Sequence, residues 1–277
     1  MKAAALAGLL AATACSYLPS QSWAQSDATV SGVRSFQQAA EACRTSFPGA
    51  GRNPGDAGGW LFEPSTSRLC LYGTLEQSDL DRFRNVMTGQ KVTNLIVRSA
   101  GGPVERWLTV GEVLAGNVET IYVDEACFSS CANYALVTAQ QVVAPEASMV
   151  VWHGGPSSLN DKLDDDDYTS FARRTDRLYA KAGISTEILS LTEKEPTAEQ
   201  MALVTQVAPE AARVAGYAIS PDRLTRCYGF SSLNEMWHGG SDTDLIALAN
   251  SKARSMAVLE FPGDTADCRG FSLLEPE

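Results

Sequence analysis

The sequence predicts an α/β fold with a largely parallel β-sheet. Between residues 68 and 152, short apolar runs alternate with segments in which apolar residues recur at helical spacing. The helical segments are long enough to connect one parallel strand to the next, and turn-forming residues separate the two kinds of segment. Alternation of this kind is typical of βαβ units. The 44% hydrophobic and 20% charged residues are typical of a globular protein.

The first 24 residues have the pattern of a signal peptide. Lys2 is followed by an apolar run over residues 3–14, which is shorter than the roughly 20 residues that a bilayer-spanning helix needs. Ser22-Trp23-Ala24 then offers small residues where a signal peptidase cuts. We therefore expect a periplasmic or secreted protein without a membrane span. A lipoprotein anchored through Cys15 is the alternative, but the usual Leu before such a Cys is missing.

An N-terminal helix and loop are expected over residues 25–64. A serine cap and apolar residues at helical spacing predict a helix over 35–47, preceded by a loose lead. The stretch 48–59 is rich in Gly, Pro and Asn, which predicts a loop.

The α/β domain is expected over residues 65–217. Its first strand is predicted to end at Gly73, and Asp79 and Asp81 fall in the first turn of the following helix, where negative charge is favourable. The expected strands are 68–72, 93–98, 120–123, 142–144 and 148–152, and the expected helices among them are 78–87, 104–115 and 129–139.

The acidic run from Asp164 to Asp167 is predicted to open a helix that continues through Leu178. A calcium loop would need alternating ligands and a glycine at the turn, and the run has neither. Further helices are expected over 185–191 and 197–207, and a strand over 256–261. Residues 218–277 are predicted to form a C-terminal extension closed by a disulfide.

Cysteine usage predicts disulfide bonds. Removal of the signal peptide would also remove Cys15 and leave six of the seven cysteines, an even number in an oxidising compartment. Nearest-in-sequence pairing predicts two of the bonds, and the four-residue spacing of the remaining two cysteines suits a third. A metal site is not expected, because there is no CxxC motif and neither histidine has ligand spacing. The expected pairs are Cys43 with Cys70, Cys127 with Cys131, and Cys227 with Cys268.

The charge of the chain argues against nucleic acid as a partner. The net charge is −11 at pH 7, and cleavage after Ala24 would remove Lys2 and no acidic residue, leaving 21 basic and 33 acidic residues. A surface with this excess of carboxylates repels phosphate backbones.

Three features between residues 95 and 155 have the chemistry of a serine hydrolase. Ser99-Ala100-Gly101-Gly102 ends a predicted strand with glycines that let backbone N–H groups approach a ligand. Ser130 is placed at the start of a helix, where unpaired N–H groups stabilise negative charge. His153 ends the next strand. Nucleophile, base and oxyanion donors are the parts that such an enzyme needs. The only other histidine, His238, lies in a second Trp-His-Gly-Gly sequence without this context and is expected to be structural.

Residues 95–155 resemble the Clp protease proteolytic-subunit family of the crotonase-like superfamily, and the cysteines around Ser130 resemble its extracytoplasmic relatives. The resemblance extends more weakly over residues 68–216. It implies a repeated ββα spiral, Ser130 as nucleophile and His153, 23 residues later, as base. The N–H groups of Gly102 and Cys131 would bind the oxyanion. The relatives form rings, so a homo-oligomer is compatible with the resemblance.

Two positions depart from the family pattern. Ala126-Cys127 replaces the Gly that opens the family's nucleophile turn. The family also has an Asp in a helix before a Pro-Glu-Ala sequence, whereas the matching position before Pro209-Glu210-Ala211 holds Glu199. A Glu can orient a catalytic His, so Glu199 is predicted as the third member, with Glu193 and Glu195 as alternatives.

The expected function is therefore that of a periplasmic or secreted serine hydrolase, a peptidase that acts on a peptide or protein substrate without a cofactor. One alternative is an inactive member of the fold that serves as a binding or assembly module. The other is a coenzyme A thioester enzyme, which is disfavoured because coenzyme A is not available outside the cytoplasm.

Overall fold

The computed structural model describes residues 24–51, 56–146, 148–155, 164–191, 195–211, 213–237, 239–252 and 256–261. Residues 1–23 of the predicted signal peptide, including Cys15 and Lys2, lie outside the described residues. So do Glu193, His238 and Cys268.

The main sheet has seven strands in the order β1-β2-β3-β4-β5-β8, with β6 also paired to β4. Only β1 is antiparallel to its neighbour, and the other pairs are parallel. This arrangement confirms the predicted α/β class with a mostly parallel sheet. The strands are β1 Gly59–Glu63, β2 Arg68–Tyr72, β3 Val92–Ser99, β4 Val118–Phe128, β5 Ala139–Ala144, β6 Met149–Val151 and β8 Ser232–Met236.

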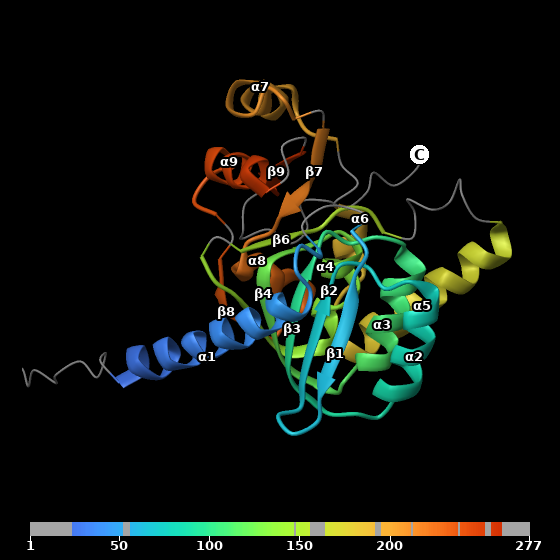
Figure 1. Ribbon diagram of the computed structural model, residues 1–277. Helices are drawn as coiled ribbons and strands as arrows, with labels where there is room; N and C mark the ends of the chain where they lie inside the picture. Colours follow the sequence, from blue (N-terminus) through green and yellow to red (C-terminus); the bar gives the residue numbers. More distant parts are fainter. Residues whose placement is uncertain are drawn as a thin grey trace, which may run out of the picture.

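Helices cover the sheet and connect its strands (Figure 1). The helix bounds are α1 Ala24–Ser46, α2 Gln77–Met87, α3 Val104–Leu114, α4 Ser130–Tyr134, a 3-10 helix Leu136–Thr138, α5 Asp165–Ala182, α6 Glu187–Leu191, α7 Ala198–Val207, α8 Pro221–Tyr228 and α9 Asp242–Lys252. Helices α8 and α9 were not predicted, and two of the predicted helices differ in extent. Helix α1 begins at Ala24 and not at residue 35, and the helix predicted over 129–139 is divided into α4 and the 3-10 helix.

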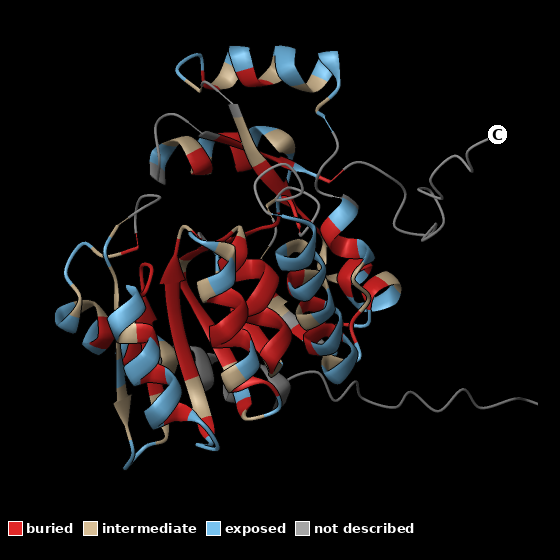
Figure 2. Cartoon of the chain, turned by 90° about the vertical axis from the view of Figure 1, so that its right-hand side faces the viewer, coloured by how far each residue is buried: buried red, intermediate tan, exposed pale blue. Residues whose placement is uncertain are grey.

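Both faces of the central strands are buried. On β2, Leu69 and Leu71 join the large core formed with α2 and α3, whereas Cys70 and Tyr72 contact the cluster under α1. Alternate residues of a strand point to opposite faces, so each central strand serves two cores. Figure 2 shows helices with buried inner faces and exposed outer faces around this sheet.

Strand β4 contains a local irregularity, and on the side away from β3 it pairs first with β5 and then with β6. Val97 and Ser99 of β3 pair with Val123 and Cys127, so β4 has extra residues in this interval, and Glu125 has a φ of 70°. The first half of β4 pairs with β5, and its last residues pair with β6. The carboxyl end of β4 is thereby redirected toward β6.

A second, two-stranded sheet is formed by β7 Arg213–Ala218 and β9 Met256–Glu260. An antiparallel bridge between Trp152 and Tyr217 connects it to the end of β6. In Figure 1 this sheet lies above the main sheet, with α9 and α7 beside it. The chain after residue 217, which was expected to be an extension, supplies one strand to each sheet.

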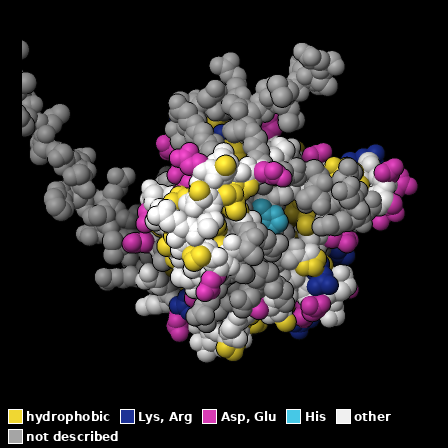
Figure 3. Space-filling model, turned by 90° about the horizontal axis from the view of Figure 1, so that it is seen from above, with side chains coloured by type: hydrophobic (Ala, Val, Ile, Leu, Met, Phe, Trp, Pro, Cys, Tyr) yellow, Lys and Arg dark blue, Asp and Glu magenta, His cyan; other side chains and the backbone are white. Residues whose placement is uncertain are grey.

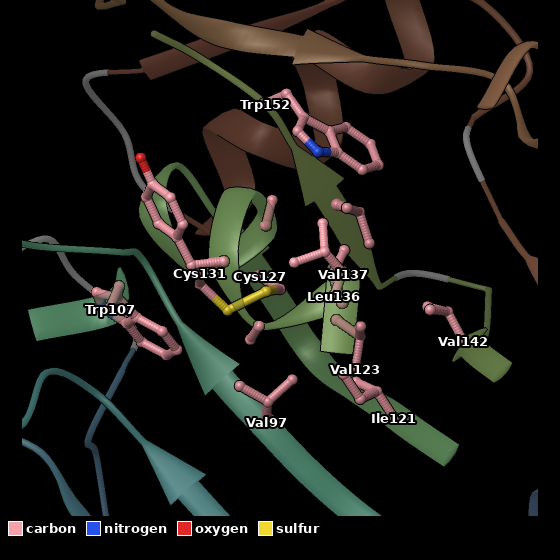
Figure 4. Close-up of a cluster of buried hydrophobic side chains, with 14 of the residues drawn as sticks. Val97, Trp107, Ile121, Val123, Cys127, Cys131, Leu136, Val137, Val142 and Trp152 are labelled. Atoms are coloured by element: carbon pink, nitrogen blue, oxygen red, sulfur yellow. A yellow bond between two sulfur atoms is a disulfide. The ribbon is translucent and has the colours of Figure 1, made fainter. Parts of the chain in front are cut away.

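Two predicted disulfides are present. Cys43–Cys70 joins α1 to β2 with a Cα–Cα distance of 5.7 Å, and Cys127–Cys131 joins the end of β4 to α4 with a Cα–Cα distance of 5.3 Å. Figure 4 shows the second bond among buried hydrophobic side chains. Cys227 is disulfide-bonded as well, and its predicted partner Cys268 lies outside the described residues.

Candidate active site

Four of the predicted site residues, Gly102, Ser130, Cys131 and His153, lie in the segments that follow the carboxyl ends of β3, β4 and β6. These ends point upward in Figure 1, opposite to the arrow of β1. Loops at the carboxyl ends of strands are the usual place for ligand sites in α/β sheets. Figure 3 shows this upper face, where a histidine side chain is exposed beside hydrophobic side chains.

Ser130 is the first residue of α4 and is almost fully buried, with 1% of its surface exposed. Its hydroxyl donates a hydrogen bond to the carbonyl oxygen of Gly102 at 3.0 Å. The residue before it, Ser129, has φ 58° and ψ −128°, a combination that non-glycine residues rarely adopt. The strained residue of this strand-to-helix turn is therefore Ser129, and Ser130 follows it inside α4.

The glycine turn after β3 lies directly against Ser130. Gly101 has a φ of 89°, and a Cβ atom there would lie 2.7 Å from the Phe128 carbonyl oxygen and 3.1 Å from the Ser130 hydroxyl oxygen. Gly102 has a φ of 139°, and its Cβ would meet the Thr74 hydroxyl oxygen at 2.4 Å. The turn approaches its neighbours this closely only because both residues lack side chains.

Hydrogen bonds fix the orientation of the peptide units in this turn. The Gly101 N–H donates to the Ser99 hydroxyl oxygen at 3.0 Å, and the Gly101 carbonyl accepts a hydrogen bond from the Thr74 hydroxyl. The next unit, between Gly102 and Pro103, has no N–H. Among the described residues, no acceptor is found for the Gly102 N–H or for the Ala100 N–H, so both are candidate donors to a ligand.

His153 follows β6 at the same interval at which Ser130 follows β4. Phe128 and Val151 are paired in these parallel strands, and the serine and the histidine each follow two residues later. Ser130 and His153 therefore both follow the carboxyl ends of neighbouring strands, at the same edge of the sheet. The backbone of His153 is also held from α4, because the Asn133 side-chain amide donates to the carbonyls of His153 at 3.4 Å and Gly154 at 2.8 Å.

Cys131 lies in the first turn of α4, where helix geometry leaves backbone N–H groups without an acceptor inside the helix. Its disulfide to Cys127 closes a loop around Phe128, Ser129 and Ser130. Because α4 has only five residues, its dipole is small, and the expected stabilisation of an oxyanion would come from the individual N–H groups.

The predicted third member lies apart from these three segments. Glu199 is exposed on α7, which contacts α9, and Glu195 is exposed just before that helix. In Figure 1, α7 is above the small sheet, and α4 lies within the main body. Nothing in this placement supports either residue as the acid that orients His153.

The buried carboxylate of β4 serves a different part of the molecule. Asp124 lies under α1, where it accepts hydrogen bonds from the Tyr72 hydroxyl at 2.6 Å and from Arg44. Burial raises the pKa of Asp124 above its ordinary value, and these hydrogen-bond and charge partners oppose the shift. The guanidinium of Arg98, also buried, lies 4.8 Å from the centre of the Tyr72 ring and donates to the Ala50 carbonyl.

Three contributors to the site are absent from the predictions: Thr74, Ser129 and Asn133. Ser129 could have been noticed as the residue that joins a strand to a helix directly. Thr74 and Asn133 act through contacts that only the fold creates, since Thr74 is 27 residues from Gly101.

The described part of the chain has no group of three or more His, Cys, Asp or Glu side chains that could hold a metal ion. None of its helices has the length and apolar character of a membrane span. No family model, curated protein or solved structure matches the chain, so the site is interpreted from its own geometry.

Proposed function

We propose that this chain is a periplasmic or secreted serine hydrolase of the Clp/crotonase-like type that cleaves peptide bonds. The observation that carries the proposal is the matched position of Ser130 and His153 at the ends of paired parallel strands, against a glycine turn. The two disulfides and the pattern of residues 1–24 support the proposed location outside the cytoplasm.

In the proposed reaction, the Ser130 oxygen attacks the substrate carbonyl and His153 accepts the serine proton. The N–H groups of Gly102 and Cys131 stabilise the negative oxygen of the tetrahedral intermediate. His153 then protonates the leaving amine, and water hydrolyses the acyl-enzyme by the same steps. For attack, the Ser130 hydroxyl must turn from the Gly102 carbonyl toward the imidazole.

Two observations favour a second function, that of a non-catalytic binding or assembly module. Ser130 is buried and bonded to a backbone carbonyl, as a structural serine is, and Glu199 is exposed on α7. In this case the turn would stabilise the fold without a reaction.

Labelling with a fluorophosphonate probe distinguishes the two functions. We expect one adduct, mapped by mass spectrometry to Ser130, and complete loss of labelling in Ser130→Ala. The matched control is Ser129→Ala, which removes the neighbouring hydroxyl and should retain labelling. Thermal unfolding should show that both variants fold, since one buried hydrogen bond contributes only about 1 kcal/mol. An unlabelled wild-type protein, or an adduct on Ser129, would contradict the assignment.

A further inference from the structure

We infer that the pocket between α3 and α5 binds a basic side chain of the substrate, lysine or arginine, next to the bond that Ser130 cleaves. The inference rests on the proposed function for the reaction, whereas the side-chain preference follows from the pocket alone.

The pocket is formed by the beginnings of two helices. It has a volume of about 390 Å³, at the lower end of the roughly 300–1,000 Å³ that is usual for ligand sites. Helix α3 contributes Val104 and Glu105 with the preceding Pro103, and helix α5 contributes Asp167, Phe171 and Arg174.

The pocket begins beside the candidate active site. Pro103 directly follows Gly102, whose carbonyl accepts the hydrogen bond from Ser130, and consecutive Cα atoms are about 3.8 Å apart. A peptide whose carbonyl lies at Ser130 would therefore have a neighbouring side chain at the entrance of the pocket.

The lining suits a long side chain that is apolar along its length and charged at its end. Phe171 is buried, Val104 is partly buried, and Pro103 completes an apolar wall for the methylene groups of a lysine or arginine. The carboxylates of Glu105 and Asp167 are exposed, at the positions where the charged end would lie.

The one basic residue of the lining, Arg174, is paired mainly with Glu112, an acid that does not line the pocket. The Arg174 guanidinium donates to both carboxylate oxygens of Glu112, at 3.0 and 2.8 Å, and this pairing holds the pKa of Arg174 above its usual value. Glu105 also interacts with the charge of Arg174, but Arg174 is already engaged by Glu112, so Glu105 and Asp167 leave the pocket with a net negative charge. It therefore attracts a cation and repels an acidic side chain.

Matched peptides test this preference. Internally quenched peptides would carry lysine, norleucine or glutamate at the residues next to the cleaved bond, where norleucine keeps the length of lysine without its charge. We expect lysine to be preferred about tenfold over norleucine, the combined effect of two partly exposed ion pairs. The double variant Glu105→Gln/Asp167→Asn should abolish this preference, and Glu119→Gln, an exposed acid on β4, should keep it.

A binding measurement separates failure of the pocket from failure of the hydrolase. Fluorescence anisotropy of the same labelled peptides needs no cleavage. If no peptide is cleaved but lysine peptides bind more tightly and lose this advantage in the double variant, the hydrolase proposal fails and the pocket proposal stands. Equal cleavage or binding of lysine and norleucine peptides, or a preference that survives in the double variant, would overturn the pocket proposal.

Discussion

At position 101 the chain needs a residue without a Cβ for two separate reasons. The backbone has a φ of 89°, which other residues adopt with strain, and the space toward Phe128 and Ser130 is already filled. Gly89 has a similar φ of 78° but open space around the position of a Cβ. Alanine substitution at these two glycines therefore separates the free-energy cost of a positive φ from the cost of steric overlap.

We expect Gly101→Ala to lower serine-probe labelling at Ser130 by at least tenfold and to destabilise the protein by about 2–4 kcal/mol, because the new methyl group must displace the turn. Gly89→Ala should cost only the conformational part, about 1–2 kcal/mol, and leave labelling unchanged. Probe kinetics and urea unfolding measure the two effects. Full labelling of Gly101→Ala would mean that the turn does not shape the site.

Positions that follow from the local sequence could be predicted, and contacts that depend on the tertiary fold could not. Ser130 and His153 were identified because each follows a recognisable strand. Thr74 and Asn133 carry no local signal, since their partners are set by strand order and by the path of α4. Glu199 was predicted from its place before Pro209-Glu210-Ala211, and the structure places it on α7, apart from His153.

At the scale of elements, the central strands were predicted well because both of their faces are buried, which makes them continuous apolar runs. The missed strands lie at the edges or outside the main sheet. Strand β1 has the pattern GWLFE and β8 the pattern SLNEM, which are short and partly polar. Their pairing depends on distant segments, so local propensity gives little information about them.

The two disulfides illustrate different uses of the same bond. Cys43–Cys70 closes a loop with a sequence separation of 27 residues and fastens α1 to the sheet, whereas Cys127–Cys131 has a separation of only 4. Loop entropy increases with loop length, so the first bond should contribute more to stability, about 3–4 kcal/mol against about 2 kcal/mol.

We therefore expect opposite effects from the two Cys-to-Ala double variants. Cys43→Ala/Cys70→Ala should lower the unfolding temperature more and change the labelling rate of the folded protein little. Cys127→Ala/Cys131→Ala should unfold at a higher temperature than the first variant but label at least tenfold more slowly, because Ser130 and the Cys131 N–H lose their rigid support. Equal labelling rates in both variants at a temperature where both are folded would contradict a local role.

For the whole molecule, the polar cluster under α1 connects the N-terminal helix to the centre of the sheet. Asp124 of β4, Tyr72 of β2 and Arg44 of α1 are joined by hydrogen bonds in a largely buried environment. Arg98 of β3 lies against the Tyr72 ring. The stability of the entire fold should therefore depend on the ionisation of Asp124.

The sign of this dependence follows from the pKa of Asp124, which burial raises above the ordinary value of 3.8. A carboxyl with a raised pKa binds its proton more tightly in the folded protein than in the unfolded chain. Its favourable contribution to stability is complete below pH 3.8 and is lost as the pH rises through the folded pKa. The wild type should accordingly lose stability relative to Asp124→Asn, which has no charge to bury, as the pH rises from 3.5 to 7.

Urea unfolding of the wild type and of Asp124→Asn between pH 3.5 and 7 measures the difference in their free energies of unfolding. The titration of the other carboxyl groups contributes nearly equally to both proteins and largely cancels. Asp124→Asn keeps an acceptor for Tyr72, so at pH 7 its free energy of unfolding should lie within about 1–2 kcal/mol of that of the wild type.

Tyr72→Phe provides the check on the sign, because the Tyr72 hydrogen bond lowers the pKa of Asp124. Without that bond the pKa should rise further, and the loss of stability toward neutral pH should become larger than in the wild type. A wild type that instead gains stability over Asp124→Asn as the pH rises would show that the pairing with Arg44 and Tyr72, and not burial, dominates the ionisation of Asp124.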